Sequence, residues 1–206
     1  MQLHKGEGFY ERLGVKPVIN ACSWVTVLGG SIMPEPVLRA MDEASRNFVD
    51  MHELNKKAGE AIARITGAEA GLVTAGASAG MLLQAAACMT GTDPAKVWRL
   101  PNTRGMRNQI VIHRVHRVGF DRNFRAAGAS LIEIGDAGST EPWELEDAIT
   151  RKTAAVAYIY GQRKSGALPL ETVVEIAHSH EVRVIVDAAA MLPPVENLTK
   201  YTKAGA

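Results

Sequence analysis

The sequence predicts an α/β fold, a mainly parallel sheet with helices on both faces, preceded by a helical N-terminal segment. Three observations favour this fold. From about residue 69 onward, short apolar runs alternate with helical stretches at regular intervals, as in βαβ units. The β-branched run Val182–Val186 indicates a strand that is covered on both faces. Residues 1–68 read as mainly helical, apart from a short extended piece at Pro17–Asn20, so we expect an amino-terminal arm or subunit-contact segment there and one domain over residues 69–206.

The arm is expected to hold a short helical turn, a glycine-rich loop and two amphipathic helices. Residues 9–14 fit the turn, and Thr26–Ser31 fits the loop because paired glycines disfavour helix and strand alike. Prolines 34 and 36 open the first long helix, since proline is tolerated in a first turn. The second has its apolar face between Leu54 and Ile65 and ends at Gly67.

The domain is expected to begin with a strand at Gly71–Thr74, a turn of small residues at 75–80 and an apolar helix at Met81–Met89. Strands and helices then alternate to the end of the chain. The further strands are predicted at 110–113, 131–134, 154–160 and 182–187, and the further helices at 94–100, 120–127, 142–150, 170–180 and 197–204.

Composition excludes several classes of protein. The chain has 206 residues, 47% hydrophobic and 22% charged, which is ordinary for a globular protein. A net charge of +1 predicts no nucleic-acid partner, and the longest apolar run is too short to span a membrane. Cys22 and Cys88 have no metal-like spacing, so we expect a reducing, cytoplasmic setting.

Two stretches suggest a bound cofactor. Asp187 ends a buried strand, where ligands bind in open α/β sheets, and Ala188, Ala189 and Ala190 after it would let a flat group come close. Such a carboxylate can pair with the ring nitrogen of pyridoxal phosphate. The alternative is an ordinary helix-capping or loop aspartate.

The second stretch is the turn between the strand at 71–74 and the apolar helix. Free N–H groups and the helix dipole make such a turn a ready anion site, and Gly76 and Ser78 suit a phosphate. The alternative is a tight turn whose small residues serve helix–sheet packing.

Several stretches together resemble fold-type I pyridoxal-phosphate enzymes of the selenocysteine-synthase-like and D-glucosaminate-6-phosphate ammonia-lyase-like group. No single motif is decisive, but their order and spacing are fairly specific. The resembling stretches are Tyr10–Ala21, Leu28–Ser31, Gly67–Thr74 with the turn after it, and Val184–Ala190 followed by Leu192-Pro193-Pro194.

The resemblance implies pyridoxal 5′-phosphate as cofactor and residues for each part of it. Gly76, Ala77 and Ser78 match the phosphate turn. His116 lies near the position of the residue that stacks on the ring, although a surface histidine between Arg114 and Arg117 is the alternative. Asp187 matches the pyridinium partner and Ala189 the small residue against the ring. A metal at His113 and His116 is not expected, because no third ligand is near.

The resemblance also implies an aspartate-aminotransferase-like large domain that is incomplete here. The family's Schiff-base lysine follows a further strand beyond the aspartate, and neither Lys200 nor Lys203 matches its motif. We therefore expect the amino-terminal portion of a lyase or transferase, inactive alone and truncated before the small domain. A small amino acid or amino sugar acid is the expected substrate. A homodimer or higher homo-oligomer is the expected assembly, with Thr26–Ser31 reaching a neighbouring subunit.

Two rival interpretations remain. Val73–Gly80 looks like the dinucleotide turn of an NAD(P)-dependent short-chain dehydrogenase, and Tyr160 and Lys164 form its Tyr-x-x-x-Lys pattern. Against this, two helices precede the turn, and Tyr160 ends a strand where a helix is needed. The other rival is a non-catalytic, truncated protein that keeps the fold.

Overall fold

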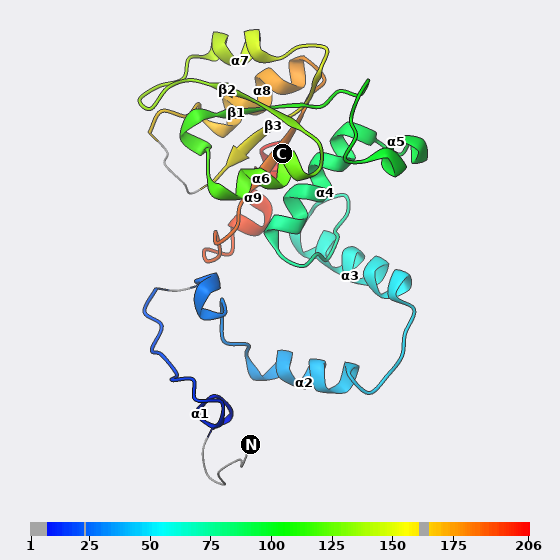
Figure 1. Ribbon diagram of the computed structural model, residues 1–206, viewed down its shortest axis with the longest axis vertical. Coiled ribbons are helices and arrows are strands. Elements are labelled where there is room, and N and C mark those ends of the chain that lie inside the picture. The colour runs from blue at the N-terminus through cyan, green and yellow to red at the C-terminus, as the bar shows by residue number, and fades with distance from the viewer. Residues whose placement is uncertain (1–7, 23, 161–164) are drawn as a thin grey trace. The chain divides into compact units, whose positions relative to one another are not determined.

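The computed structural model describes residues 8–22, 24–160 and 165–206, and the chain divides into two compact units (Figure 1). The first unit ends at Val49 and contains α1 (Phe9–Arg12), the 3-10 turn η1 (Thr26–Leu28) and α2 (Glu35–Ala44). These are the helical turn, the loop and the first amphipathic helix that the sequence predicts. The division falls at residue 49, so α3 belongs to the second unit; the domain boundary near residue 68 stays a prediction.

The second unit is built on a four-stranded parallel sheet. Its strands are β1 (Gln109–His113), β2 (Ser130–Ile134), β3 (Thr153–Ile159) and β4 (Arg183–Asp187), in the order β2-β1-β3-β4. Every pairing is parallel, with Val111 opposite Ile132 on one side and Val156 on the other. The predicted parallel sheet is confirmed, and the four strands lie within a residue or so of their expected bounds.

Helices connect and cover the strands. In chain order they are α3 (Met51–Thr66), α4 (Ala77–Thr90), α5 (Pro94–Arg99), the 3-10 turns η2 (Arg114–His116) and η3 (Gly119–Asp121), α6 (Arg122–Ala126), α7 (Pro142–Ala148), α8 (Leu170–Ser179) and α9 (Asn197–Lys203). All correspond to predicted helices except η2, which the sequence does not indicate. The helix α4 begins four residues earlier than predicted, inside the small-residue turn.

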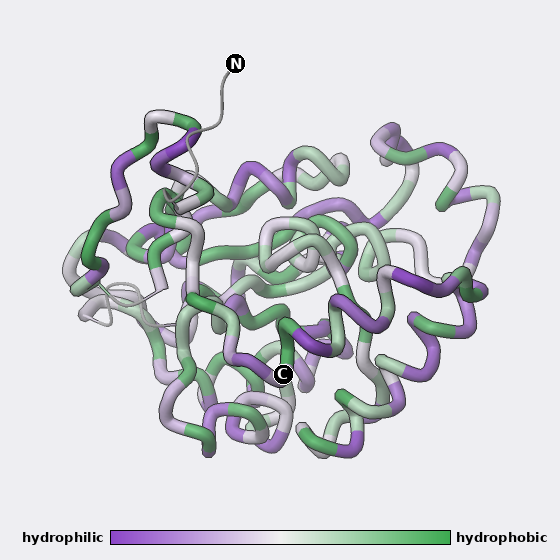
Figure 2. Tube along the Cα trace, turned by 90° about the horizontal axis from the view of Figure 1, so that it is seen from below, coloured by the Kyte–Doolittle hydropathy of each residue, from purple (hydrophilic) through white to green (hydrophobic). Residues whose placement is uncertain are grey.

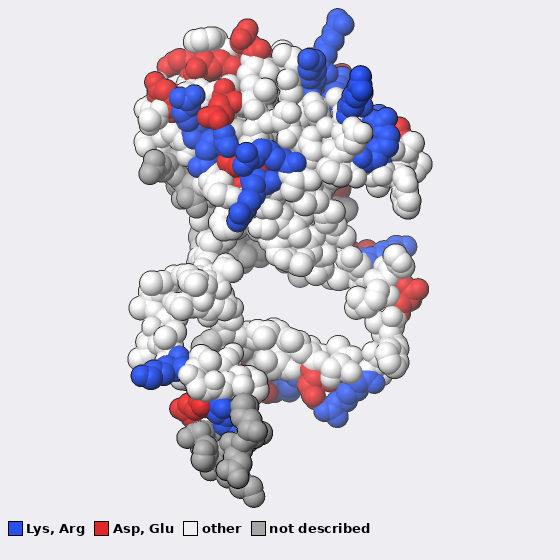
Figure 3. All heavy atoms as spheres, in the orientation of Figure 1, with Lys and Arg blue, Asp and Glu red and all other residues white. Residues whose placement is uncertain are grey.

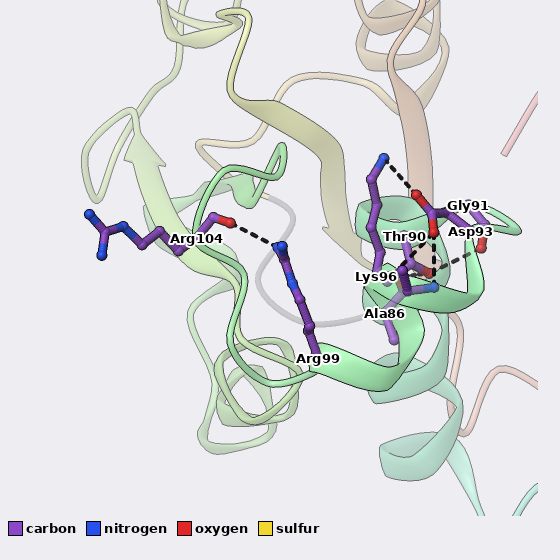
Figure 4. A network of polar contacts seen from close by, with 8 residues as sticks. Ala86, Thr90, Gly91, Asp93, Lys96, Arg99 and Arg104 are labelled. Carbon is purple, nitrogen blue, oxygen red and sulfur yellow. Dashed lines mark hydrogen bonds and ion pairs between the residues drawn. The ribbon is translucent and has the colours of Figure 1, made fainter.

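Local caps explain why the helices begin and end where they do. The Asp50 carboxylate accepts from the backbone N–H groups of His52 and Glu53, and Gly67 ends α3 in the left-handed conformation at φ 69°. Figure 4 shows the junction of α4 and α5, where the Asp93 carboxylate caps α5 by accepting from the N–H groups of Ala95 and Lys96. These signals are local, so the sequence alone places most helix ends correctly.

Two hydrophobic clusters lie on opposite faces of the sheet. On one face, Val156 and Val184 pack with Val173 of α8 and Tyr201 of α9. On the other, Ile112 and Ile185 pack with α4 and α6. Alternate strand residues point to opposite faces, so each strand contributes to both clusters. Hydrophobic and hydrophilic stretches alternate along the trace, as Figure 2 shows.

The prediction of a strand at Gly71–Thr74 is wrong. The segment carries no strand pairing with any described residue, and Leu72 and Val73 are exposed. It packs instead against α3, where a Cβ atom built on Gly59 would lie 2.2 Å from the carbonyl oxygen of Gly71. A segment with β-type composition forms a strand only where another strand supplies hydrogen-bond partners. The local pattern of side chains does not show whether such a partner strand is present.

Charges on the surface are mixed. Figure 3 shows Lys and Arg side chains beside Asp and Glu side chains over the second unit. Arg117 forms ion pairs with both Asp121 and Glu133. In the part of the chain that the structure describes, every helix is too short or too polar to cross a bilayer.

Candidate cofactor site

Asp187 is the last residue of β4, at the carboxyl edge of the sheet as predicted. Its Oδ1 accepts from the N–H of Ala189 at 3.0 Å, and its backbone carbonyl accepts from the N–H of Tyr160 at 2.8 Å. The carboxylate is half-buried and forms no ion pair with a described residue. It is therefore held by the turn after β4, while Ala189 and Ala190 remain exposed beside it.

The turn at Gly76–Ser78 forms the first residues of α4. Gly76 is the N-cap at φ 101°, and no side chain caps the helix. The first N–H groups of an α-helix have no acceptor within the helix, so this end offers donors and the positive end of the dipole. Ala77 and Ser78 are exposed. This arrangement suits an anion such as a phosphate group.

Asp187 and the turn are both linked to the α4 face of the sheet. Ile185, two residues before Asp187, packs in the same hydrophobic cluster as Met81 and Ala85 of α4. Because strand side chains alternate, Asp187 points to that same face. We therefore expect the carboxylate and the helix N-terminus to serve one ligand, although none of the described hydrogen bonds joins them directly.

His116 lies on the other face. It ends η2, is 1% exposed, and its ring centroid lies 4.5 Å from that of Tyr158 and 5.0 Å from that of His113. Tyr158 belongs to the α8 cluster. Burial lowers the pKa of His116 to about 4, so its imidazole is neutral at pH 7. It is not a surface histidine, and its role in stacking on the cofactor ring stays a prediction.

His113 is also buried and neutral. Its Nε2 accepts from the N–H of Leu168 at 3.3 Å, and burial, together with His116, lowers its pKa to about 4. Within the described residues, no group of three His, Cys, Asp or Glu side chains could hold a metal ion.

Sequence reasoning missed a contact between Tyr160 and Lys200. The Nζ of Lys200 donates to the phenolic oxygen of Tyr160 at 2.9 Å. The dehydrogenase interpretation pairs Tyr160 with Lys164, which lies outside the described residues. No local signal predicts the observed contact, because α9 brings Lys200 to the end of β3 from far along the chain.

Comparisons with known proteins show which family the chain resembles. The aminotransferase class-V family model matches residues 121–198. The chain is 36% identical to D-glucosaminate-6-phosphate ammonia lyase of Salmonella typhimurium over 203 residues, 96% of this chain and 54% of that protein. It is 37% identical to 5′-C-glycyluridine monooxygenase-decarboxylase of a Streptomyces species over 188 residues, 87% of this chain and 47% of that protein.

Weaker and structural similarities point the same way. Identity to L-seryl-tRNA(Sec) selenium transferase of Nautilia profundicola is 28% over 128 residues, 56% of this chain and 29% of that protein. A solved structure of D-glucosaminate-6-phosphate ammonia-lyase superposes with a TM-score of 0.91 at 36% identity, over 98% of this chain and 55% of that chain. An aspartate aminotransferase of Thermotoga maritima, at 16% identity and a TM-score of 0.53, shares the fold over 87% of this chain and 48% of its own. The chain spans about half the length of its most similar curated relatives.

Proposed function

Because the chain belongs to the fold-type I pyridoxal-phosphate enzyme group, we propose that it forms the cofactor-binding part of a lyase or transferase. The substrate is a small amino acid or an amino sugar acid, by analogy with the ammonia lyase that it resembles. The single observation that carries the proposal is the shared sheet face of Asp187 and the uncapped N-terminus of α4.

Each proposed residue has a definite task. The N–H groups at the start of α4 and the Ser78 hydroxyl bind the phosphate. Asp187 holds a proton on the ring nitrogen, because a nearby negative charge favours the charged form of a base. Ala189 leaves room for the ring, and we propose that His116, which follows β1 at the same carboxyl edge of the sheet, stacks its neutral imidazole on the ring from there. Pyridoxal phosphate, when bound, supplies an electron sink for negative charge at the substrate α-carbon.

The residues present fit this cofactor. The first turn of α4 has no side-chain cap. Gly76 has a positive φ of 101°, which glycine adopts without strain, and it has no side chain to block access to the turn. Asp187 has no cationic partner among the described residues that would compete for its charge. Neither Lys200 nor Lys203 follows the family's lysine motif, so we propose that residues 1–206 alone do not bind the cofactor covalently and do not turn over substrate.

The test is an absorbance titration of the 206-residue chain with pyridoxal phosphate. We expect saturable binding that Ser78→Ala weakens, while Ser130→Ala at the exposed start of β2 leaves it unchanged. NAD is titrated in parallel to examine the dehydrogenase interpretation. Absence of pyridoxal phosphate binding, or equal binding by the two variants, would contradict the phosphate assignment.

We also propose that the protein forms a homodimer or a higher homo-oligomer in the cytoplasm, without a nucleic-acid partner. The first unit has large apolar side chains that are exposed to solvent, and clusters of such side chains often mark protein–protein interfaces. They include Ile19, Val27, Ile32 and Phe48. The loop Thr26–Ser31 lies among them and is proposed to reach a neighbouring subunit. Analytical ultracentrifugation checks the assembly, and a monomer over the micromolar range contradicts it.

A further inference from the structure

A pocket of about 350 Å³ lies at the carboxyl edge of the sheet, on the face that α8 and α9 cover. Asp187 and the start of α4 do not line it. Its walls come from the turn after β1, the end of β3, the start of α8 and α9. The lining residues used below are His116, Tyr158, Tyr160, Glu171, Lys200 and Ala204.

The pocket carries one positive and one negative side chain that are not paired. Lys200 donates to the hydroxyl of Tyr160 at 2.9 Å, which leaves two of its three N–H bonds for another acceptor. Glu171 lies in the first turn of α8 and is exposed. Neither forms an ion pair with any described residue, and they are the two formally charged residues of the lining.

The remaining polar groups of the pocket are neutral. His116 is 1% exposed and lines the pocket, and its Nδ1 has no hydrogen-bond partner among the described residues. The ten-residue helix α8 has no side-chain cap, and its N-terminus adds backbone donors to the same hollow.

The apolar part of the lining is small and partly aromatic. The Tyr158 hydroxyl donates to the carbonyl of Leu168 at 3.2 Å, so this side chain presents its ring to the pocket. Ala204 adds a methyl group from the end of α9. Small-molecule sites typically combine such walls with a few placed polar groups, at volumes of about 300–1,000 Å³.

We propose that this pocket binds a small α-amino acid in its zwitterionic form. The carboxylate lies on the Lys200 ammonium group and the donors of α8, and the ammonium group lies on the Glu171 carboxylate. The side chain of the amino acid lies between Tyr158 and Ala204. A molecule with both charges satisfies both side chains, whereas one with a single charge leaves one of them without a partner. The site requires no pyridoxal phosphate, and of the residues proposed for the cofactor only His116 lines it.

The test is calorimetric titration of the 206-residue chain without pyridoxal phosphate. The probes are alanine with both charges, propionate with the carboxylate alone and ethylamine with the ammonium group alone. We expect saturable binding of alanine, and binding at least about tenfold weaker for each single-charge probe, the scale of one charged hydrogen bond.

Variants identify the site. Lys200→Met and Glu171→Gln should each weaken alanine binding about tenfold or more, while Lys200→Arg keeps the charge and most of the affinity. Lys203→Met is the matched control, since Lys203 is in the same helix but does not line the pocket. No alanine binding by the parent chain overturns the proposal. Equal binding of propionate, or an equal loss in Lys203→Met, also overturns it, and the probe series decides even if a variant fails to fold.

Discussion

The Nζ of Lys200 lies 2.9 Å from the phenolic oxygen of Tyr160 and 5.1 Å from the centre of its ring. The hydrogen bond to Tyr160 raises the pKa of Lys200 above its ordinary value. This hydrogen bond connects α9 to the residue that follows β3, and β3 pairs with β4, the strand that ends at Asp187.

Replacing Tyr160 by Phe removes the acceptor of this contact. The pKa of Lys200 should then fall toward its ordinary value, because the hydrogen bond no longer favours the ammonium form. An NMR titration of labelled lysine side chains measures the change, with Lys203 as internal reference. A Lys200 titration identical in both proteins would contradict the contact.

Asp187→Asn should leave the fold and the affinity for pyridoxal phosphate nearly intact while removing the charge beside the ring nitrogen. The ring nitrogen then loses its proton more readily, which a ¹⁵N chemical shift of labelled cofactor bound to the chain reports. In any form of the protein that turns over substrate, we expect a loss of about 100-fold or more, the scale of a main electrostatic contribution.

Asp136→Asn is the matched control. Asp136 follows β2 as Asp187 ends β4, and its Oδ1 likewise accepts backbone N–H groups, those of Gly138 and Ser139. This substitution should leave the ¹⁵N shift unchanged. Equal shifts in the two variants would show that Asp187 is not the ring partner.

Stability should decline as pH falls from 6.5 toward 4. Burial lowers the pKa of both His113 and His116 to about 4 from 6.5, so the unfolded chain binds more protons throughout that window. The stabilisation is fully present above pH 6.5 and lost as pH approaches 4. Each histidine accounts for on the order of 3 kcal/mol at the full extent.

Urea unfolding at pH 7 and pH 5 measures this dependence. His116→Gln, which keeps a neutral polar side chain, should reduce the difference between the two pH values. His52→Gln on the exposed surface of α3 should not change it. A parent protein equally stable at both pH values would refute the burial of these neutral imidazoles.

Two glycines inside helices should respond oppositely to alanine. In Gly59→Ala the new methyl would meet the backbone of Gly71 at 2.2 Å, so we expect a loss of about 1–3 kcal/mol from overpacking. In Gly80→Ala the nearest atom is the Thr74 hydroxyl at 3.8 Å, so higher helix propensity should stabilise by up to about 1 kcal/mol. Urea unfolding compares them, and a stabilised Gly59→Ala would contradict the close approach of α3 to Gly71.

Local sequence signals predict most of this fold. Gly67 marks the end of α3 and the β-branched run to Asp187 marks β4, because capping and burial leave traces in adjacent residues. The prediction of a strand at Gly71–Thr74 is wrong, because strand pairing depends on a partner strand elsewhere in the chain. The sequence also does not predict that His116 is buried against Tyr158 or that Lys200 contacts Tyr160. These residues are distant in sequence, and only the sheet and α9 bring them together.

The strand order β2-β1-β3-β4 also sets how readily backbone amides exchange with deuterium. Among the described residues, β1 and β3 each pair on both sides, whereas β2 and β4 each pair on one. The interior strands should therefore be the most protected, and exchange should reach them only through large-scale opening. The strand β4, which ends at Asp187, pairs on one side only and should open more easily. A ligand that binds Asp187 should therefore slow deuterium uptake along β4.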